Sequence, residues 1–482
     1  MKKVTILFVC IFLLALPFKS VFVEGQTIES DSNLKQIDDY IAKEMKAAQI
    51  PGLSLGIVKG DEIVHLKGYG FANDSDEPVT PQTPFILGST SKSFTAMAIM
   101  KLVEQGKIDL DAPVQTYLPT IQLDTNITVR HLLNQTSGIS KTPTKKDVAW
   151  EIRTENIGKL FEYSNENYKL LGDIISSVSN TTYEEFIEET IFKPLEMNHS
   201  YTSQTLAEAD GLAEGYRTWF GFNFSNKLPY NEEYLPAGYL IDMTHYLILQ
   251  MNKGQFNNRT ILSPSGIEAM HTPNVEAPML GEASYYGMGW FISPTNGVPT
   301  IKHSGEVPNY HSTMIMMPNE NYGIILLTNI NNSILVSALI EKIGAGVVDL
   351  LAGKQPEPIS NNTYLQMYLI LDAILLVIFL LLILHMRNMK KWKERVKNGE
   401  RPIFQTYLYP LFINLVVPVL ILTQFPKITG FTWSFLFDFV PDITSVLLSI
   451  SLILLLVGVI RVYLLARLLR KKWGLTPSAL KL

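Results

Sequence analysis

The sequence predicts an α/β (α+β) fold, in which helices flank an antiparallel sheet, followed by three transmembrane helices. Alternating apolar strands occur near both ends of the region from about residue 30 to 355, and helical patterns fill its middle. This layout favours one antiparallel sheet built from both ends of the region, with an inserted all-helical region between them. Three apolar runs follow, each about 20 residues long and therefore long enough to cross a bilayer.

The N-terminal residues predict export from the cytoplasm. Two lysines precede an apolar run over residues 4–17, and cleavage near Gly25 would remove residues 1–25 as a signal peptide. An uncleaved signal anchor is the alternative. The only cysteine, Cys10, lies inside this run, so the exported protein is expected to lack disulfides. The formal net charge of −5 over 482 residues gives no reason to expect a nucleic-acid partner.

Residues 30–355 predict one large domain. An amphipathic helix over 33–48 precedes a hairpin of strands 53–58 and 63–70, and a buried helix follows Phe85. A helix over 129–139 ends near a glycine, and further helices are expected over 167–177 and 183–192. The pattern then returns to strands, and a helix over 334–351 closes the domain. These strands are expected at 287–292, 300–303, 312–317 and 322–329.

The three apolar runs are expected to span a membrane at residues 364–386, 403–424 and 443–465. Seven basic residues lie between 387 and 401, and four more follow the third run. The connection between the second and third runs instead carries Lys427 against Asp438 and Asp442. By the positive-inside rule, the first loop and the C-terminus are cytoplasmic, and the large domain is extracytoplasmic. The chain is therefore predicted to be a multi-pass cell-membrane protein.

Two features of the predicted spans invite separate interpretation. Asp372 lies in the first span, where a carboxylate suggests either function or a small polar contact near the outer end. Pro410 and Pro418 are expected to kink the second span.

The segment around Ser89 and Lys92 is the first candidate for chemistry. Both residues lie at the start of the buried helix, three positions apart and hence on one face. A serine hydroxyl becomes a good nucleophile when a base accepts its proton, and a lysine amine can serve as that base. The alternative is that both residues belong to a solvated helix face.

Tyr163 and Asn165 form a second candidate, in a loop that leads into a helix. A tyrosine beside a lysine can relay a proton, and an asparagine side chain offers a donor and an acceptor to a substrate amide. The alternative is a polar helix cap with aromatic packing.

His303, Ser304 and Gly305 form a third candidate at the end of a strand. A glycine there allows a substrate backbone to lie close. The backbone N–H just beyond it and the N–H of Ser89 would make an oxyanion hole, and His303 would supply a polar or cationic group. The alternative is a strand-end histidine without a chemical role.

Together these motifs resemble the serine β-lactamase and penicillin-binding-protein superfamily, and within it the class C-like branch. Ser89 and Lys92 match S-x-x-K, Tyr163-Ser164-Asn165 match Y-x-N, and His303-Ser304-Gly305 match H-x-G. The resemblance extends to five further segments, at residues 68–70, 131–138, 165–168, 236–239 and 287–290.

This resemblance implies a β-lactamase/transpeptidase-like fold and an acyl-enzyme mechanism without metal or cofactor. Ser89 would attack the substrate, and Lys92 with Tyr163 would handle protons. Asn165 and His303 would orient the substrate, with Ser304 and Gly305 beside them in the binding site.

A class C-like domain followed by three spans resembles two groups of proteins. One comprises penicillin-binding-protein-like serine hydrolases of Gram-positive bacteria, and it looks the closer match. The other comprises membrane-anchored peptidases that remove an acylated D-amino-acid prodrug segment from non-ribosomal peptides. Two departures from the family border the expected cleft. The stretch 139–161 is short and lacks a Pro-Gly pair before the tyrosine motif, and 239–244 is trimmed.

The expected function is hydrolysis of D-amino-acid peptides or esters at the outer membrane face. The expected substrates are small peptides, esters or β-lactam-like molecules, and efficient β-lactam hydrolysis is less expected because no motif here guarantees a well-placed deacylating water. Two alternatives stay open. The first is a catalytically impaired protein that binds or senses a wall fragment or antibiotic, and the second is a function that resides in the spans.

Overall fold

The computed structural model of this protein describes residues 31–121, 123, 127–139, 152–226, 240–332, 336–360, 362–399 and 404–472. The predicted signal peptide, residues 1–25, lies outside these residues. So do residues 140–151 and 239, which belong to the two segments that depart from the family pattern, and residue 403 of the second predicted span.

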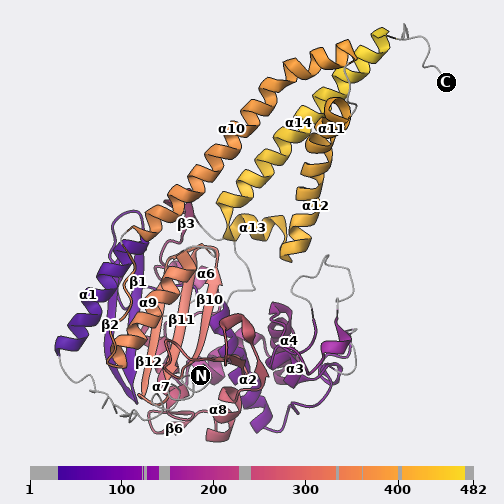
Figure 1. Ribbon diagram of the computed structural model, residues 1–482. Helices are drawn as coiled ribbons and strands as arrows, with labels where there is room; N and C mark the ends of the chain where they lie inside the picture. The colour runs from indigo at the N-terminus through magenta and orange to yellow at the C-terminus, as the bar shows by residue number, and fades with distance from the viewer. Residues whose placement is uncertain are drawn as a thin grey trace, which may run out of the picture.

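An eight-stranded antiparallel sheet forms the centre of the globular domain (Figure 1). Its strand order is β2-β1-β12-β11-β10-β9-β8-β7, so the hairpin from the start of the domain pairs with a strand from its end. This arrangement confirms the predicted sheet built from both ends. The strands are β1 Gly52–Lys59, β2 Glu62–Gly70, β7 Val275–Glu276, β8 Tyr285–Tyr286, β9 Phe291–Ile292, β10 Ile301–Val307, β11 Tyr310–Met317 and β12 Tyr322–Thr328.

Helices cover both faces of this sheet, and each face has its own apolar core. Helices α1 (Asp31–Ala48) and α9 (Val336–Leu351) pack on one face, against side chains such as Ile324 of β12. Helices α2 (Lys92–Glu104) and α7 (Leu240–Met251) pack on the other. Because both faces are covered, β11 and β12 are buried along their whole length, and β12 is apolar through most of it.

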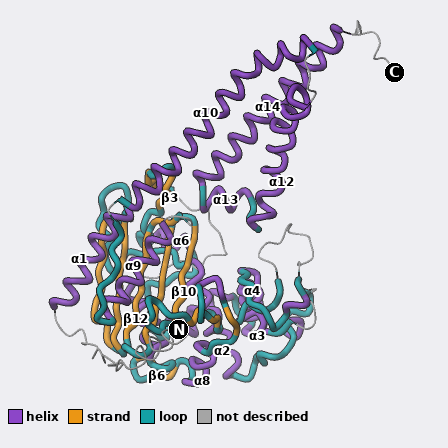
Figure 2. Tube along the Cα trace, viewed as in Figure 1, coloured by secondary structure: helices purple, strands orange, loops and turns teal. Residues whose placement is uncertain are grey.

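The inserted region lies beside the sheet and is mainly helical (Figure 2). Its remaining helices are α3 Val129–Leu133, α4 Asn165–Ser179, α5 Tyr183–Ile187, α6 Gln204–Ala209 and α8 Pro264–His271. It also contains two short hairpins, β3–β4 and β5–β6, and β3 pairs in parallel with β13 from the end of the domain. These strands are β3 Tyr216–Trp219, β4 Phe222–Ser225, β5 Gln255–Phe256, β6 Arg259–Thr260 and β13 Ile330–Asn331.

Two predicted elements are shorter than expected because the backbone turns within them. The helix expected over 129–139 ends at Leu133, since Gln135 and Gly138 adopt positive φ values of 58° and 70°. The strand expected over 287–292 is reduced to β9, since Gly289 has a φ of 84° and lies against α2. Helix α2 therefore approaches the sheet closely at this glycine.

The C-terminal part contains three helices long and apolar enough to cross a membrane: Thr363–Asn398, Thr406–Thr429 and Pro441–Leu468. They extend away from the globular domain as a bundle (Figure 1). The second includes π-helical turns at 404–408 and 412–416, beside the prolines predicted to disturb it. The helices are α10 Thr363–Asn398, α11 Tyr409–Leu411, α12 Val417–Thr429, α13 Trp433–Phe439 and α14 Pro441–Lys472.

The β3–β4 hairpin attaches the globular domain to this bundle. Arg217 Nη2 forms an ion pair with Asp438 Oδ1 of α13 at 2.9 Å, and Phe220 N donates to Asp442 Oδ1 of α14 at 3.0 Å. The hydroxyl of Tyr364 on α10 donates to the carbonyl of Gly221 at 3.3 Å. One hairpin therefore contacts α10, α13 and α14 and fixes the bundle relative to the domain.

Candidate active site

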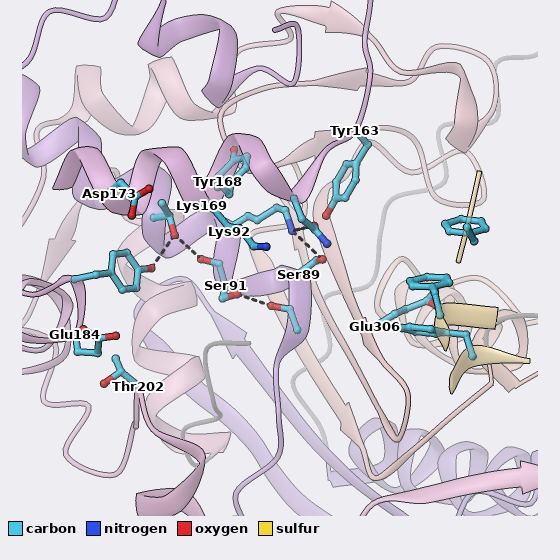
Figure 3. A pocket seen from close by; sticks show the side chains of 18 of the residues that line it. Ser89, Ser91, Lys92, Tyr163, Tyr168, Lys169, Asp173, Glu184, Thr202 and Glu306 are labelled. Atoms are coloured by element: carbon cyan, nitrogen blue, oxygen red, sulfur yellow. Dashed lines mark hydrogen bonds between the residues drawn. The ribbon is translucent and has the colours of Figure 1, made fainter. Parts of the chain in front are cut away.

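Ser89 and Lys92 lie together at the junction of a 3₁₀ turn, Gly88–Ser91, with helix α2 (Figure 3). Lys92 Nζ donates to Ser89 Oγ at 3.0 Å, as expected for two residues three apart on a helical turn. Lys92 is buried, with 7% of its surface exposed, whereas Ser89 is partly exposed. The pair is thus a buried amine beside an accessible hydroxyl, and it does not belong to a solvated helix face.

The turn that carries Ser89 is anchored to strands β10 and β11. Ser312 Oγ of β11 donates to Leu87 O at 2.5 Å and also bonds Thr90 Oγ1 at 3.0 Å. On β10, a Cβ added to Gly305 would lie 1.8 Å from Leu87 O and 2.9 Å from Ser89 N. Only glycine at this position lets the turn lie so close to the sheet.

Asn165 and two tyrosine rings surround the Lys92 ammonium. Lys92 Nζ donates to Asn165 Oδ1 at 2.8 Å, at the first residue of α4. It also lies 5.0 Å from the ring centre of Tyr163 and 5.7 Å from that of Tyr168. The hydrogen bond and the two aromatic faces hold the lysine head beside the serine.

A buried polar cluster, which the sequence did not predict, supports the loop that carries Tyr163. Gln135 Oε1 accepts from Ser164 N at 3.0 Å and from Asn167 Nδ2 at 2.5 Å, and Ser137 Oγ donates to Asn167 Oδ1 at 2.6 Å. Asn167 and Ser137 are fully buried. The segment after α3 therefore holds the tyrosine loop in place. In the sequence, only the resemblance of residues 131–138 to the family indicated that this segment matters.

His303 lies on β10 and is buried, with 1% of its surface exposed. Its ring packs against Phe291 and Tyr163, at centroid distances of 5.2 and 6.3 Å, and Nδ1 donates to Ser304 O at 2.8 Å. Burial, with the nearby Lys92 ammonium, lowers the pKa of His303 to about 3. At neutral pH the ring is uncharged. His303 is therefore a polar group here and not a cation.

The third motif sits inside a strand, and this corrects its predicted position at a strand end. Strand β10 continues to Val307, and alternation places Ser304 on the opposite face from His303 and Gly305. Accordingly, Ser304 Oγ accepts a hydrogen bond from Thr313 Oγ1 at 3.4 Å, under α9. The hydroxyl of Ser304 points away from Ser89, and Gly305 admits the turn that carries Ser89.

Two backbone N–H groups, those of Ser89 and Glu306, lie where the Ser89 turn meets β10. A Cβ built on Gly305 would lie 2.9 Å from Ser89 N, and one built on Gly88 would lie 3.1 Å from Glu306 N. In addition, β9 pairs with β10 only at Ile301 and Lys302. Beyond Lys302, this side of β10 faces the turn that carries Ser89, a position in which two N–H donors can bind an oxyanion.

Ser89 opens into a cavity of about 1750 Å³. Lys92, Tyr163 and Asn165 also line it, whereas His303 does not (Figure 3). Asp173 on α4 lies further along the wall, and burial together with Glu166 raises its pKa. The structure therefore brings four of the predicted site residues to one cavity and places His303 behind them. Among the described residues, no group of three or more His, Cys, Asp or Glu is arranged to hold a metal ion.

The sequence of this domain matches the family model for the β-lactamase family over residues 37–339. The chain belongs to the β-lactamase family. The match covers the whole sheet, the inserted region and every residue of the three motifs, and it ends within α9. The chain is therefore a serine-hydrolase-like protein of the β-lactamase and penicillin-binding-protein type.

Similar proteins extend this assignment. The chain is 30% identical to Protein flp of Staphylococcus aureus over 347 residues, which are 66% of this chain and 68% of that protein. In another S. aureus strain the similarity reaches 88% of this chain and 89% of Protein flp, at 27% identity. A putative penicillin-binding protein of Bacillus subtilis, PbpX, is 28% identical over 65% of this chain and 80% of its own length.

Solved structures confirm the fold of this β-lactamase-family chain. An octameric penicillin-binding protein homologue from Pyrococcus abyssi superposes with a TM-score of 0.60 at 30% identity. The superposition covers 67% of this chain and 78% of that protein. The sheet flanked by helices, with a helical insertion, is therefore a β-lactamase-like fold, as predicted.

Proposed function

We propose that this chain is a membrane-anchored, extracytoplasmic serine hydrolase that forms an acyl-enzyme on Ser89. The observation that carries the proposal is the 3.0 Å contact between Lys92 Nζ and Ser89 Oγ inside a cavity that the hydroxyl faces. A lysine at this distance is within reach of the serine proton, which is the first geometric requirement of a general base.

In the proposed reaction, Lys92 Nζ first releases one proton of its resting ammonium to solvent. Ser89 Oγ then attacks the carbonyl carbon of an ester or amide, and its proton passes to the Lys92 amine. The N–H groups of Ser89 and Glu306 stabilise the oxyanion. Tyr163, whose ring lies beside Lys92 Nζ, relays a proton to the leaving group as the carbonyl–heteroatom bond breaks. Water then hydrolyses the ester on Ser89, which restores the hydroxyl and releases the acid.

The substrates we propose are peptides or esters that contain D-amino acids. Asn165, held by Lys92 at the rim of the cavity, orients the substrate amide, and the side of β10 beyond Lys302 offers backbone hydrogen bonds. His303 is neutral and supports the Tyr163 ring from behind by packing, without contributing a charge. Together with the predicted signal peptide and the basic loops, this proposal places the reaction on the outer side of the cell membrane.

The test is hydrolysis of paired D-alanyl and L-alanyl esters by the full chain in detergent. The wild type should hydrolyse the D-ester faster, and Ser89→Ala should lower kcat/KM at least about thousandfold. Ser177→Ala is the matched control, because Ser177 lies on the exposed side of α4, and it should leave both rates unchanged. Equal rates for Ser89→Ala and the wild type would refute the proposal and favour a binding or sensing protein.

A further inference from the structure

The cavity that contains Ser89 has a second wall, which comes from the membrane helices. Its lining includes residues of α12, α13 and α14 in addition to those of α2 and α4. In Figure 1, α13 lies across the end of the bundle that faces the globular domain, on the side of α4. The nucleophile therefore shares one cavity with the ends of two candidate spans.

This second wall is apolar and rich in aromatic rings. Phe431, Phe435 and Phe439 form a continuous stack, with ring centroids 4.4 and 4.3 Å apart. Thr429 is the one polar residue among the described lining residues from 425 to 443, and its hydroxyl donates to Phe425 O at 3.0 Å. A ligand segment against this wall therefore meets aromatic and aliphatic groups and no charge.

The facing wall, on the globular domain, is polar. Lys169 and Asp173 on α4 and Glu184 on α5 line it, to one side of Ser89 (Figure 3). At about 1750 Å³, the cavity also exceeds the roughly 300–1,000 Å³ of ordinary small-molecule sites. A ligand that fills it must be long and must be apolar along one side or at one end only.

The position of the apolar wall favours a ligand that comes from the bilayer. Candidate spans two and three end at Thr429 and begin at Pro441, so the aromatic stack lies where these spans leave the membrane. The ion pair of Arg217 with Asp438 and the bond of Phe220 N to Asp442 hold this wall over the site. A hydrocarbon chain could pass from the outer leaflet to the stack without crossing water.

We propose that the hydrolase acts on amphiphiles: the long aliphatic chain of the substrate lies on the Phe431–Phe435–Phe439 stack while its carbonyl reaches Ser89. This inference rests on the proposed function of Ser89 and adds the class of substrate. The chain is held by burial of methylene groups, each of which contributes about 0.8 kcal/mol, equivalent to roughly a fourfold gain in binding. The polar portion of the amphiphile faces α4 and α5.

The test compares an ethyl and a dodecyl fluorophosphonate as probes of the full chain in lipid nanodiscs. In each case Ser89 Oγ bonds to phosphorus, fluoride leaves, and the serine proton passes to Lys92. Intact-mass measurements give the labelling rate of each probe, and the readout is the ratio of the dodecyl rate to the ethyl rate. Partition of the dodecyl probe into lipid is the same for every variant, so it cancels between them.

Phe435→Ala and Phe431→Ala should each lower this ratio roughly five- to tenfold while the ethyl rate stays that of the wild type. Phe437→Ala is the matched control. Phe437 lies on the same helix with 41% of its surface exposed, does not line the cavity, and should leave the ratio unchanged. An unchanged ethyl rate also shows that each variant is folded.

The possible results separate this inference from the function beneath it. A ratio that is unchanged in Phe435→Ala and Phe431→Ala, or lowered equally in Phe437→Ala, overturns the amphiphile proposal and leaves the hydrolase intact. Absence of labelling by both probes in the wild type overturns the proposed function, and the substrate class falls with it.

Discussion

Replacing Gly305 by alanine should separate the position of the nucleophile from the stability of the fold. The new Cβ would lie 1.8 Å from Leu87 O, 2.6 Å from Ser312 Oγ and 2.9 Å from Ser89 N. Contacts of side-chain carbons essentially never fall below 3.0 Å, so Leu87 O must retreat by more than about 1 Å. Ser89 belongs to the same short turn and must move with it.

The expected costs follow from that displacement. Overpacking of this size costs about 1–3 kcal/mol of unfolding free energy, which leaves a large domain folded. A displacement of about 1 Å between reacting groups can cost roughly 10²-fold in rate, because the hydroxyl, the lysine and the N–H donors no longer align. Labelling of Ser89 by the ethyl fluorophosphonate should therefore fall about a hundredfold in Gly305→Ala.

The assay is the labelling rate measured beside thermal unfolding. Gly344→Ala is the control: Gly344 lies in α9, and its added Cβ meets only Ile315 Cδ1, at 3.6 Å. That variant should keep the wild-type labelling rate and gain about 0.5–1 kcal/mol from helix propensity. A Gly305→Ala protein that is labelled as fast as the wild type would show that the close approach of β10 does not position the nucleophile.

Three further predictions concern the surroundings of the site. Burial, with the neighbouring ammonium, holds the pKa of His303 near 3, so the unfolded chain binds the proton first on acidification. The wild type should then lose about 2 kcal/mol more unfolding free energy than His303→Gln between pH 7 and 5, measured by urea titration; equal losses would contradict this. Asn167→Ala leaves the Gln135 amide short of one partner, so it should cost about 2 kcal/mol by thermal unfolding and slow labelling of Ser89. Unchanged unfolding would show that this cluster does not support the tyrosine loop. Arg217→Ala removes the ion pair with Asp438, which should cost at most about 1 kcal/mol but lower the dodecyl-to-ethyl labelling ratio; a ratio like the wild type's would show that this ion pair does not hold the wall in place.

Local patterns predicted the strands and the contact of Ser89 with Lys92 because both depend on short-range geometry. The strand at 322–329 is β-branched and apolar, and the covered sheet needs such a run at its centre. Ser89 and Lys92 meet because any helical turn brings positions three apart together. Neither prediction required knowledge of distant contacts.

Other features depend on distant contacts and could not be predicted in this way. Asn165 accepts a hydrogen bond from Lys92, which lies 73 residues earlier in the chain. Only the family resemblance predicted that these two residues share a site. The Gln135 cluster depends on the positive φ of Gln135, which the residue type alone does not predict. The aromatic wall lies at the site because the β3–β4 hairpin contacts α13 and α14. Local sequence periodicity does not predict these contacts.

One feature of the third motif was foreseeable from the sequence itself. Side chains alternate along a strand, so Ser304 had to face away from whichever side His303 and Gly305 occupy. The motif places three neighbouring residues in substrate binding, but the strand allows at most two of them to share a face.

Activation of Ser89 by Lys92 is tested by peptide mapping after exposure of the full chain to a fluorophosphonate, alongside Ser89→Ala and Lys92→Ala. One adduct is expected, on the peptide that contains Ser89; it should be absent in Ser89→Ala and form at least about a hundredfold more slowly in Lys92→Ala. An adduct on another serine, or labelling at an equal rate without the lysine, would contradict a nucleophile activated by Lys92.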